Sequence, residues 1–331
     1  GKDSPEFLNR IYTNAWMKLP IGKARYGVML REDGIVFDDG TTTRISENHF
    51  HMTTTTAQAA NVLAHLEYYL QVVWPELDVN VLSTTEQWAG AALAGPNSRN
   101  LLEKLFPKVD VSNENLPFMG IVQTKLKNGI PCRIARISFS GEMAFEIYVP
   151  SDYANEMMEM IWIETEKVGG CLYGLEALGA LRIEKGHVTG AELDGRVTID
   201  DAGLGKMAST KKSYIGSAMR KRGVLNSEDR EMLVGFFPVN KNETFDAGTI
   251  VCEKNNIKGF GIGRITSVTH SPELGHWLGI GFVKGGRKIL EDQEHIFVEE
   301  LVDCEKTIYN ELSTEAKLII WKSKHNRKGG I

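Results

Sequence analysis

The 331-residue sequence has no long apolar run, and it has no excess of positive charge. No window approaches the about 18 consecutive apolar residues of a membrane-spanning helix, and no signal peptide is visible. The net charge is -5, whereas non-specific nucleic-acid binding requires a basic surface. We therefore expect a protein that binds neither a membrane nor a nucleic acid, and we expect it in the cytoplasm.

Several motifs of common enzyme classes are also missing. No Gly-x-Gly-x-x-Gly follows a strand, so no NAD or FAD site of that kind is expected. No Ser/His/Asp spacing supports hydrolysis. His49 and His51 share one face of a strand, but no third ligand is evident and we expect no metal site. The cysteines lack Cys-x-x-Cys spacing, which predicts buried thiols in a reducing compartment. They are Cys132, Cys171, Cys252 and Cys304.

Helix and strand signals alternate over the first two thirds of the chain. Ser4 and Pro5 mark a helix start, because proline costs little in a first helical turn. Amphipathic spacing predicts a helix over about 57–73. Further helices are expected after the cap at 95–98 and over about 151–167. Strands are expected at 35–39, 41–45, 79–82, 89–93, 121–125, 132–139 and 144–149.

From about residue 230 the pattern changes to short β runs separated by glycine and asparagine. These runs are 233–237, 249–252, 261–268, 277–283 and 295–302. A charged stretch at 220–229 separates the two patterns. The sequence therefore predicts an α+β protein with one domain over 1–220 and a small all-β domain over 230–331.

The segment most suggestive of chemistry is residues 31–41, which read REDGIVFDDGT. Asp33-Gly34 is a strong hairpin-turn signal, and the apolar residues after it favour a strand. Side chains alternate across a strand, so Asp38 and Asp39 should point to opposite faces, one into water and the other into a pocket. A solvated strand end is the alternative reading of the same residues.

An ordered series of motifs resembles the aminomethyltransferase (glycine-cleavage T-protein) family. The motifs lie at 1–10, 22–30, 34–39, 138–146, 181–187, 200–205 and 265–275. The stretches at 7–16, 52–56 and 184–188 are most similar to one branch, the C-terminal half of the α subunit of heterotetrameric sarcosine oxidase. The resemblance extends to about Gly286. Relatives carry additional residues before the position that Gly1 matches, so the chain is expected to be N-terminally truncated relative to the family.

The resemblance implies a T-protein-like, folate-binding α/β body over 1–220, followed by a C-terminal barrel-like domain. Tetrahydrofolate would be the substrate, and the one-carbon unit would arrive as an iminium or aminomethyl group. Asp39 would be the catalytic residue near N10 of the folate. Glu146 would bind the donor edge of the pterin, and Phe139, at a family tyrosine, would stack on it. The other binding candidates are Tyr26, Thr41 and Arg182.

Some family features do not carry over, and alternatives remain. Leu178 replaces a family arginine, and Arg182 could simply pair with Glu184. His187 and His270 are expected to be scaffold. The favoured function is conversion of an amine-derived methylene to 5,10-methylenetetrahydrofolate, as part of sarcosine oxidase with its other subunits as partners. The alternatives are glycine-cleavage aminomethyl transfer, demethylation of another substrate, and a non-catalytic folate-binding protein or fragment. The non-catalytic alternative corresponds to the iron–sulphur-cluster-assembly branch of the family. That branch carries a cysteine-containing motif, and residues 211–217 of this chain lack the cysteine.

Overall fold

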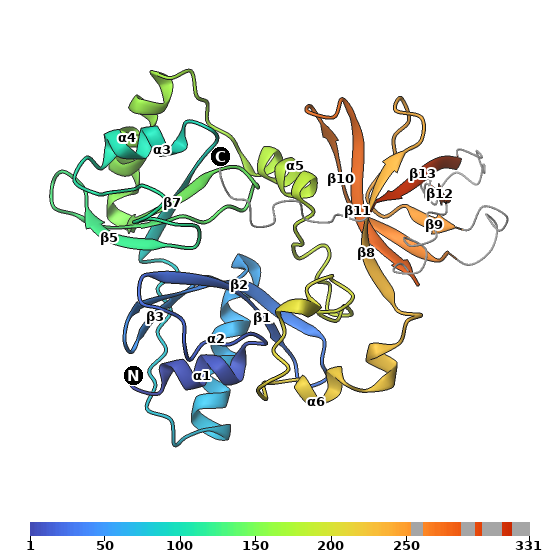
Figure 1. Ribbon diagram of the computed structural model, residues 1–331, viewed down its shortest axis with the longest axis horizontal. Coiled ribbons are helices and arrows are strands. Elements are labelled where there is room, and N and C mark those ends of the chain that lie inside the picture. The colour runs from blue at the N-terminus through green and yellow to red at the C-terminus, as the bar shows by residue number, and fades with distance from the viewer. Residues whose placement is uncertain (253–260, 286–294, 300–312, 320–331) are drawn as a thin grey trace.

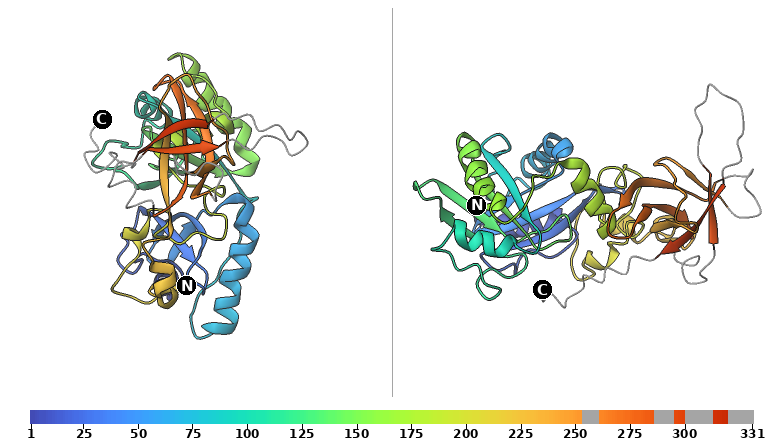
Figure 2. Two further views of the ribbon diagram at one scale, coloured as in Figure 1. Left: turned by 90° about the vertical axis from the view of Figure 1, so that its right-hand side faces the viewer. Right: turned by 90° about the horizontal axis from the view of Figure 1, so that it is seen from above.

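A computed structural model describes residues 1–252, 261–285, 295–299 and 313–319. Helices and three antiparallel sheets follow one another along the chain, so the predicted α+β class is confirmed (Figures 1 and 2). No helix within these ranges is long and apolar enough to cross a membrane. The predicted strand over 295–302 lies partly outside the described residues, as does Cys304.

The first sheet has the order β1-β2-β3 and is covered on one face by two helices. Its strands are β1 (Lys23–Leu30), β2 (Val36–Ser46) and β3 (His49–Met52). The helices are α1 (Ser4–Ile11) and α2 (Ala59–Tyr68), which a 3-10 turn (Thr56–Gln58) precedes and a π-helical turn (Tyr69–Val73) extends. The apolar faces of both helices join a core that includes Phe7, Ile11, Val62 and Leu66. This agrees with the amphipathic spacing that predicted both helices.

The second sheet has the order β4-β7-β6-β5 and packs against two further helices. The strands are β4 (Trp88–Ala94), β5 (Ile121–Lys125), β6 (Pro131–Ala135) and β7 (Ala144–Pro150). The helices are α3 (Ser98–Leu105) and α4 (Ala154–Glu166), the latter preceded by a 3-10 turn (Ser151–Tyr153). Leu102, Ile134 and Phe145 are fully buried between them. Met157 of α4 is also in this core, whereas Met158 is exposed.

Helix α5 (Leu175–Lys185) connects this body to the C-terminal strands and contacts β10 and β11. Short helical turns lie at Gly205–Met207, α6 (Ser217–Arg220) and Gly223–Asn226. The strands are β8 (Glu231–Pro238), β9 (Ile250–Cys252), β10 (Gly263–Ser271), β11 (His276–Lys284), β12 (His295–Glu299) and β13 (Ser313–Ile319). They hydrogen-bond in the closed order β10-β11-β8-β13-β12-β9.

Three expectations about this fold are wrong. The strand expected over 132–139 ends at Ala135. Residues 79–82 form no strand; Val79 and Val81 pack onto the core beneath the first sheet without pairing to a neighbouring strand. Alternating valines bury one face equally well in an extended segment, so their spacing alone does not show whether a partner strand exists. Cys171 is exposed, whereas Cys132 and Cys252 are buried as predicted.

Candidate functional site

One face of the first sheet carries Tyr26, Asp39 and Thr41. Tyr26 lies opposite Thr41 in the β1–β2 pairing, and Asp39 is two residues from Thr41, so alternation places all three on that face. The Tyr26 hydroxyl donates to Asp39 Oδ2 at 2.6 Å. Burial raises the pKa of Asp39, and burial together with the Asp39 charge raises the pKa of Tyr26. The carboxylate is thus held in one orientation and partly shielded from water.

Asp38 points to the other face, as predicted, but it does not point into water. It pairs with Met29, whose side chain belongs to the core beneath the helices, and it is 3% exposed. The more buried member of the pair is therefore Asp38, which corrects the expectation that one carboxylate is solvated. The cause is that α1 and α2 cover this face of the sheet. Burial raises the pKa of Asp38 to about 6.

Residues 53–55 cross β2 beside both aspartates. The Thr55 backbone N–H donates to Asp38 Oδ2 at 3.3 Å. This crossing requires Gly40, because a Cβ there would lie 2.0 Å from the carbonyl oxygen of Thr53. A residue without a Cβ is therefore required after the two aspartates, and only the tertiary structure shows why.

The buried Asp38 should make stability depend on pH. Its folded pKa of about 6 lies above the ordinary 3.8, so its stabilising contribution is present below pH 3.8 and lost as the pH rises through about 6. Asparagine stays neutral at both pH values. We therefore expect the free energy of unfolding of Asp38→Asn, relative to that of the wild type, to rise by about 2 kcal/mol between pH 4 and pH 7. Urea unfolding at both values measures this. Asp152→Asn, at an exposed position, is the control. An unchanged difference at the two pH values would contradict the prediction.

Glu146 lies on β7 of the second sheet, where the Tyr148 hydroxyl donates to its Oε2. Burial raises the pKa of Glu146, and its charge contributes to a raised pKa at Tyr173. The edge of the Tyr148 ring meets His51 of β3 at 5.9 Å between centroids. Glu146 and Tyr148 lie two residues apart on β7 and so share a face, which the His51 contact shows to be the face toward the first sheet.

A second link joins the sheets through His187, just beyond the end of α5. Its ring lies 5.7 Å from that of Tyr26 and 4.9 Å, edge to face, from that of Phe139. Lys185 holds the Phe139 segment by donating to the Ser138 carbonyl at 2.7 Å. Burial is the main cause that lowers the pKa of His187 to about 4, so its ring is neutral at neutral pH. The structure thus brings His187, which the sequence predicts to be scaffold, into contact with Phe139 and with Tyr26, the residue that holds Asp39.

Arg182 does not join this group. Its guanidinium donates to Glu192 Oε2 at 2.8 Å, to Ser267 Oγ at 2.6 Å and to the His187 carbonyl at 3.1 Å. The partner is Glu192 rather than Glu184, because residues 186–192 fold back beneath the helix end. Arg182 reaches the site indirectly, through the backbone that carries His187.

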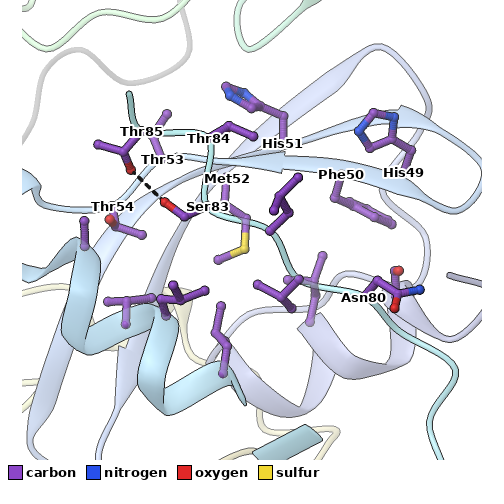
Figure 3. A pocket seen from close by; sticks show the side chains of 18 of the residues that line it. His49, Phe50, His51, Met52, Thr53, Thr54, Asn80, Ser83, Thr84 and Thr85 are labelled. Carbon is purple, nitrogen blue, oxygen red and sulfur yellow. Dashed lines mark hydrogen bonds between the residues drawn. The ribbon is translucent and has the colours of Figure 1, made fainter. Parts of the chain in front are cut away.

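The remaining candidate residues are Thr41 and the histidines. Thr41 Oγ1 lies 2.8 Å from Thr53 Oγ1, so its hydroxyl is engaged within the sheet. His49 and His51 project from the same side of β3 (Figure 3). Within the described ranges no three His, Cys, Asp or Glu side chains gather in a way that could hold a metal ion. His270 packs against Trp277 in the C-terminal sheet.

The fold is that of an aminomethyltransferase-type protein. The structure superposes on glycine cleavage system aminomethyltransferase T from Bartonella henselae with a TM-score of 0.81, at 22% identity, covering 99% of this chain and 83% of that one. The family model described as the GCVT N-terminal domain matches residues 1–212. The chain therefore belongs to the glycine-cleavage T-protein (GCVT) family, as its motifs predicted.

Two relatives refine the placement within the family. Sarcosine oxidase subunit alpha of Rhizobium meliloti (strain 1021) is 45% identical over 296 residues, which is 87% of this chain and 29% of that protein. The aminomethyltransferase of Listeria monocytogenes serotype 4a is 31% identical over 290 residues, 86% of this chain and 74% of that protein. The chain thus spans less than a third of the sarcosine oxidase subunit, and the predicted similarity to that subunit is confirmed.

Proposed function

We propose that this chain transfers an amine-derived methylene group to tetrahydrofolate, yielding 5,10-methylenetetrahydrofolate. The observation that carries the proposal is the partly buried Asp39 carboxylate, which accepts a hydrogen bond from Tyr26. The Tyr26 ring contacts that of His187, which in turn contacts Phe139. Aromatic rings together with two partly buried carboxylates, Asp39 and Glu146, match the chemistry of a pterin, which has a flat body and a guanidine-like donor edge. Tetrahydrofolate supplies the two nitrogens that receive the methylene group.

Asp39 would act on the substrate nitrogen N10. Attack of that nitrogen on a methylene iminium develops positive charge, which a nearby carboxylate stabilises, and ring closure releases a proton that the carboxylate can accept. Burial raises the pKa of Asp39 and so makes it a stronger base than a solvated aspartate. Tyr26 holds the carboxylate by its hydrogen bond and shares one wall of the site with His187.

The remaining residues would bind and orient the folate. Phe139 offers a ring for stacking, and its lack of a hydroxyl leaves hydrogen bonding to Glu146 and Asp39. Arg182 would act as a positioning residue, since it holds the carbonyl of His187. Thr41 would lie on the floor of the site next to Tyr26.

The wider setting is part of the same proposal. The chain would comprise a folate-binding domain over 1–220 and a C-terminal β domain over 230–331, working in the cytoplasm in one-carbon metabolism. The 45% identity to the sarcosine oxidase subunit, against 31% to the aminomethyltransferase, favours a sarcosine-type amine as the source of the methylene and sarcosine oxidase subunits as partners.

Loss of the Glu146 charge should weaken folate binding. Glu146→Gln keeps an acceptor for the Tyr148 hydroxyl but cannot accept two charge-assisted hydrogen bonds from the pterin edge. We expect the Kd for tetrahydrofolate to rise about tenfold or more, measured by anaerobic calorimetric titration. Glu142→Gln, an exposed glutamate of the preceding turn, is the control. Equal affinity in wild type and Glu146→Gln would remove Glu146 from the site, and no saturable binding by the folded chain would overturn the proposed function.

A further inference from the structure

A pocket of about 590 Å³ opens at the outer edge of β3, next to the candidate site but distinct from it. It is lined by residues of α1, β3 and α2, by the segment 79–85, and by Trp88, Arg133 and Tyr148. Figure 3 shows Phe50 and Met52 pointing to one side of β3 and His49 and His51 to the other. The pocket therefore has an apolar side and a polar side.

The polar side contains a guanidinium without an anionic partner. Arg133 stacks on Trp88, with 4.0 Å from its central carbon to the ring centroid. Its Nε is buried and has no hydrogen-bond partner, and no ion pair within the described ranges uses its guanidinium. Burial lowers the pKa of Arg133. A buried, unpaired donor of this kind is costly unless a ligand satisfies it.

The residues around Arg133 favour a negatively charged ligand. None of the described residues that line the pocket is Asp or Glu. Tyr148, directly opposite Arg133 in the β6–β7 pairing, already donates its hydroxyl to Glu146. Burial and the Arg133 charge lower the pKa of His51 to about 4, so that ring is neutral near pH 7. Arg133 is thus the fixed positive charge on this side, and hydroxyls of Ser83 and Thr85 stand along the rim.

We propose that this pocket binds a small monocarboxylate with an apolar body. The carboxylate would accept two parallel hydrogen bonds from the Nε and one Nη of Arg133, a geometry that a guanidinium offers and an ammonium does not. The stacking of Arg133 on Trp88 fixes the plane of this fork. The body of the ligand would lie on the same side of β3 as Arg133, next to the rings of Trp88 and Tyr148. This inference is independent of the folate chemistry proposed above.

The test uses benzoate and its neutral isostere benzamide as probes. With ¹⁵N-arginine-labelled full-length chain, the Nε–H signal of Arg133 is assigned from its loss in Arg133→Gln. We expect benzoate to shift that signal saturably and to bind about tenfold more tightly than benzamide. Equal binding of the two probes, or no saturable shift, would overturn the proposal.

Two variants control for charge and for folding. Arg133→Lys keeps a positive charge without the fork, so the preference for benzoate should shrink but persist, as followed by ¹H signals of the ligand. Arg25→Gln removes another arginine that stacks on a tryptophan, Trp16, outside the pocket, and it should leave the preference unchanged. Loss of the preference in Arg25→Gln, or its full retention in Arg133→Gln, would contradict the assignment.

Discussion

Asp39→Asn is expected to reduce one-carbon transfer by about a hundredfold or more while leaving the fold and most of the folate affinity intact. Asparagine has nearly the same shape and can still accept the hydrogen bond of Tyr26, which now lies 2.6 Å from Oδ2. It cannot accept a proton, and it carries no negative charge to stabilise the developing cation. The defect should therefore appear in kcat and much less in the Kd for tetrahydrofolate.

The measurement is the rate of 5,10-methylenetetrahydrofolate formation from tetrahydrofolate and formaldehyde-derived iminium, compared across pH. In the wild type the rate should rise with pH through the raised pKa of Asp39 and then level off, because the ionised form is the active base. Asp39→Asn should lack this step. Asp152→Asn serves as the surface control. Full activity in Asp39→Asn would remove Asp39 from the mechanism.

The largest effect on stability is expected from Glu192→Ala. Glu192 is fully buried and pairs with Arg182, while its other oxygen accepts from Ser267 at 2.6 Å and from Thr266 at 2.7 Å. Removing the carboxylate leaves the Arg182 charge buried without a partner, which typically costs about 3–5 kcal/mol. Because Ser267 lies on β10 and Arg182 on α5, the loss should also weaken the attachment of the C-terminal strands to the body.

Equilibrium urea unfolding, followed by circular dichroism, checks this expectation. Glu184→Ala is the matched control, because Glu184 lies on the same helix as Arg182 and forms no ion pair within the described ranges; its effect should be small. A double variant, Arg182→Met with Glu192→Leu, should recover much of the loss, because no buried charge then lacks a partner. A change below about 1 kcal/mol in Glu192→Ala would show that the pair is not a main support of the fold.

The strand that carries the candidate site could be predicted from local rules. The Asp33-Gly34 turn is present, with Gly34 at a φ of 87°, and alternation correctly placed Asp38 and Asp39 on opposite faces. The alternation of side chains along the strand does not predict which face of the sheet the helices cover. Helices α1 and α2 pack on the Asp38 side, and only their position makes Asp38 the more buried carboxylate.

Helix α5 shows a different limit of the sequence. Its residues were interpreted as a family motif, and no helix was predicted there. Gly174 precedes the helix and Gly179 lies within it, where glycine is a weak helix former. The apolar positions form no continuous stripe, because Arg182 faces the buried side. Sequence rules place a charged residue such as Arg182 on the surface, because charged side chains are rarely buried without a partner. Only the fold shows that Glu192 is that partner.

The sequence by itself determined the α+β class, most helices and strands, the family, and the residues that we propose for folate chemistry. These depend on local rules, namely turn residues, periodicity and motifs, which act over a few neighbouring residues. The tertiary structure alone decided that His187 lies between Tyr26 and Phe139, that Arg182 pairs with Glu192, and that Arg133 lacks an acidic partner among the described residues. These contacts join residues far apart in the chain, and their energies depend on burial, which no local pattern specifies.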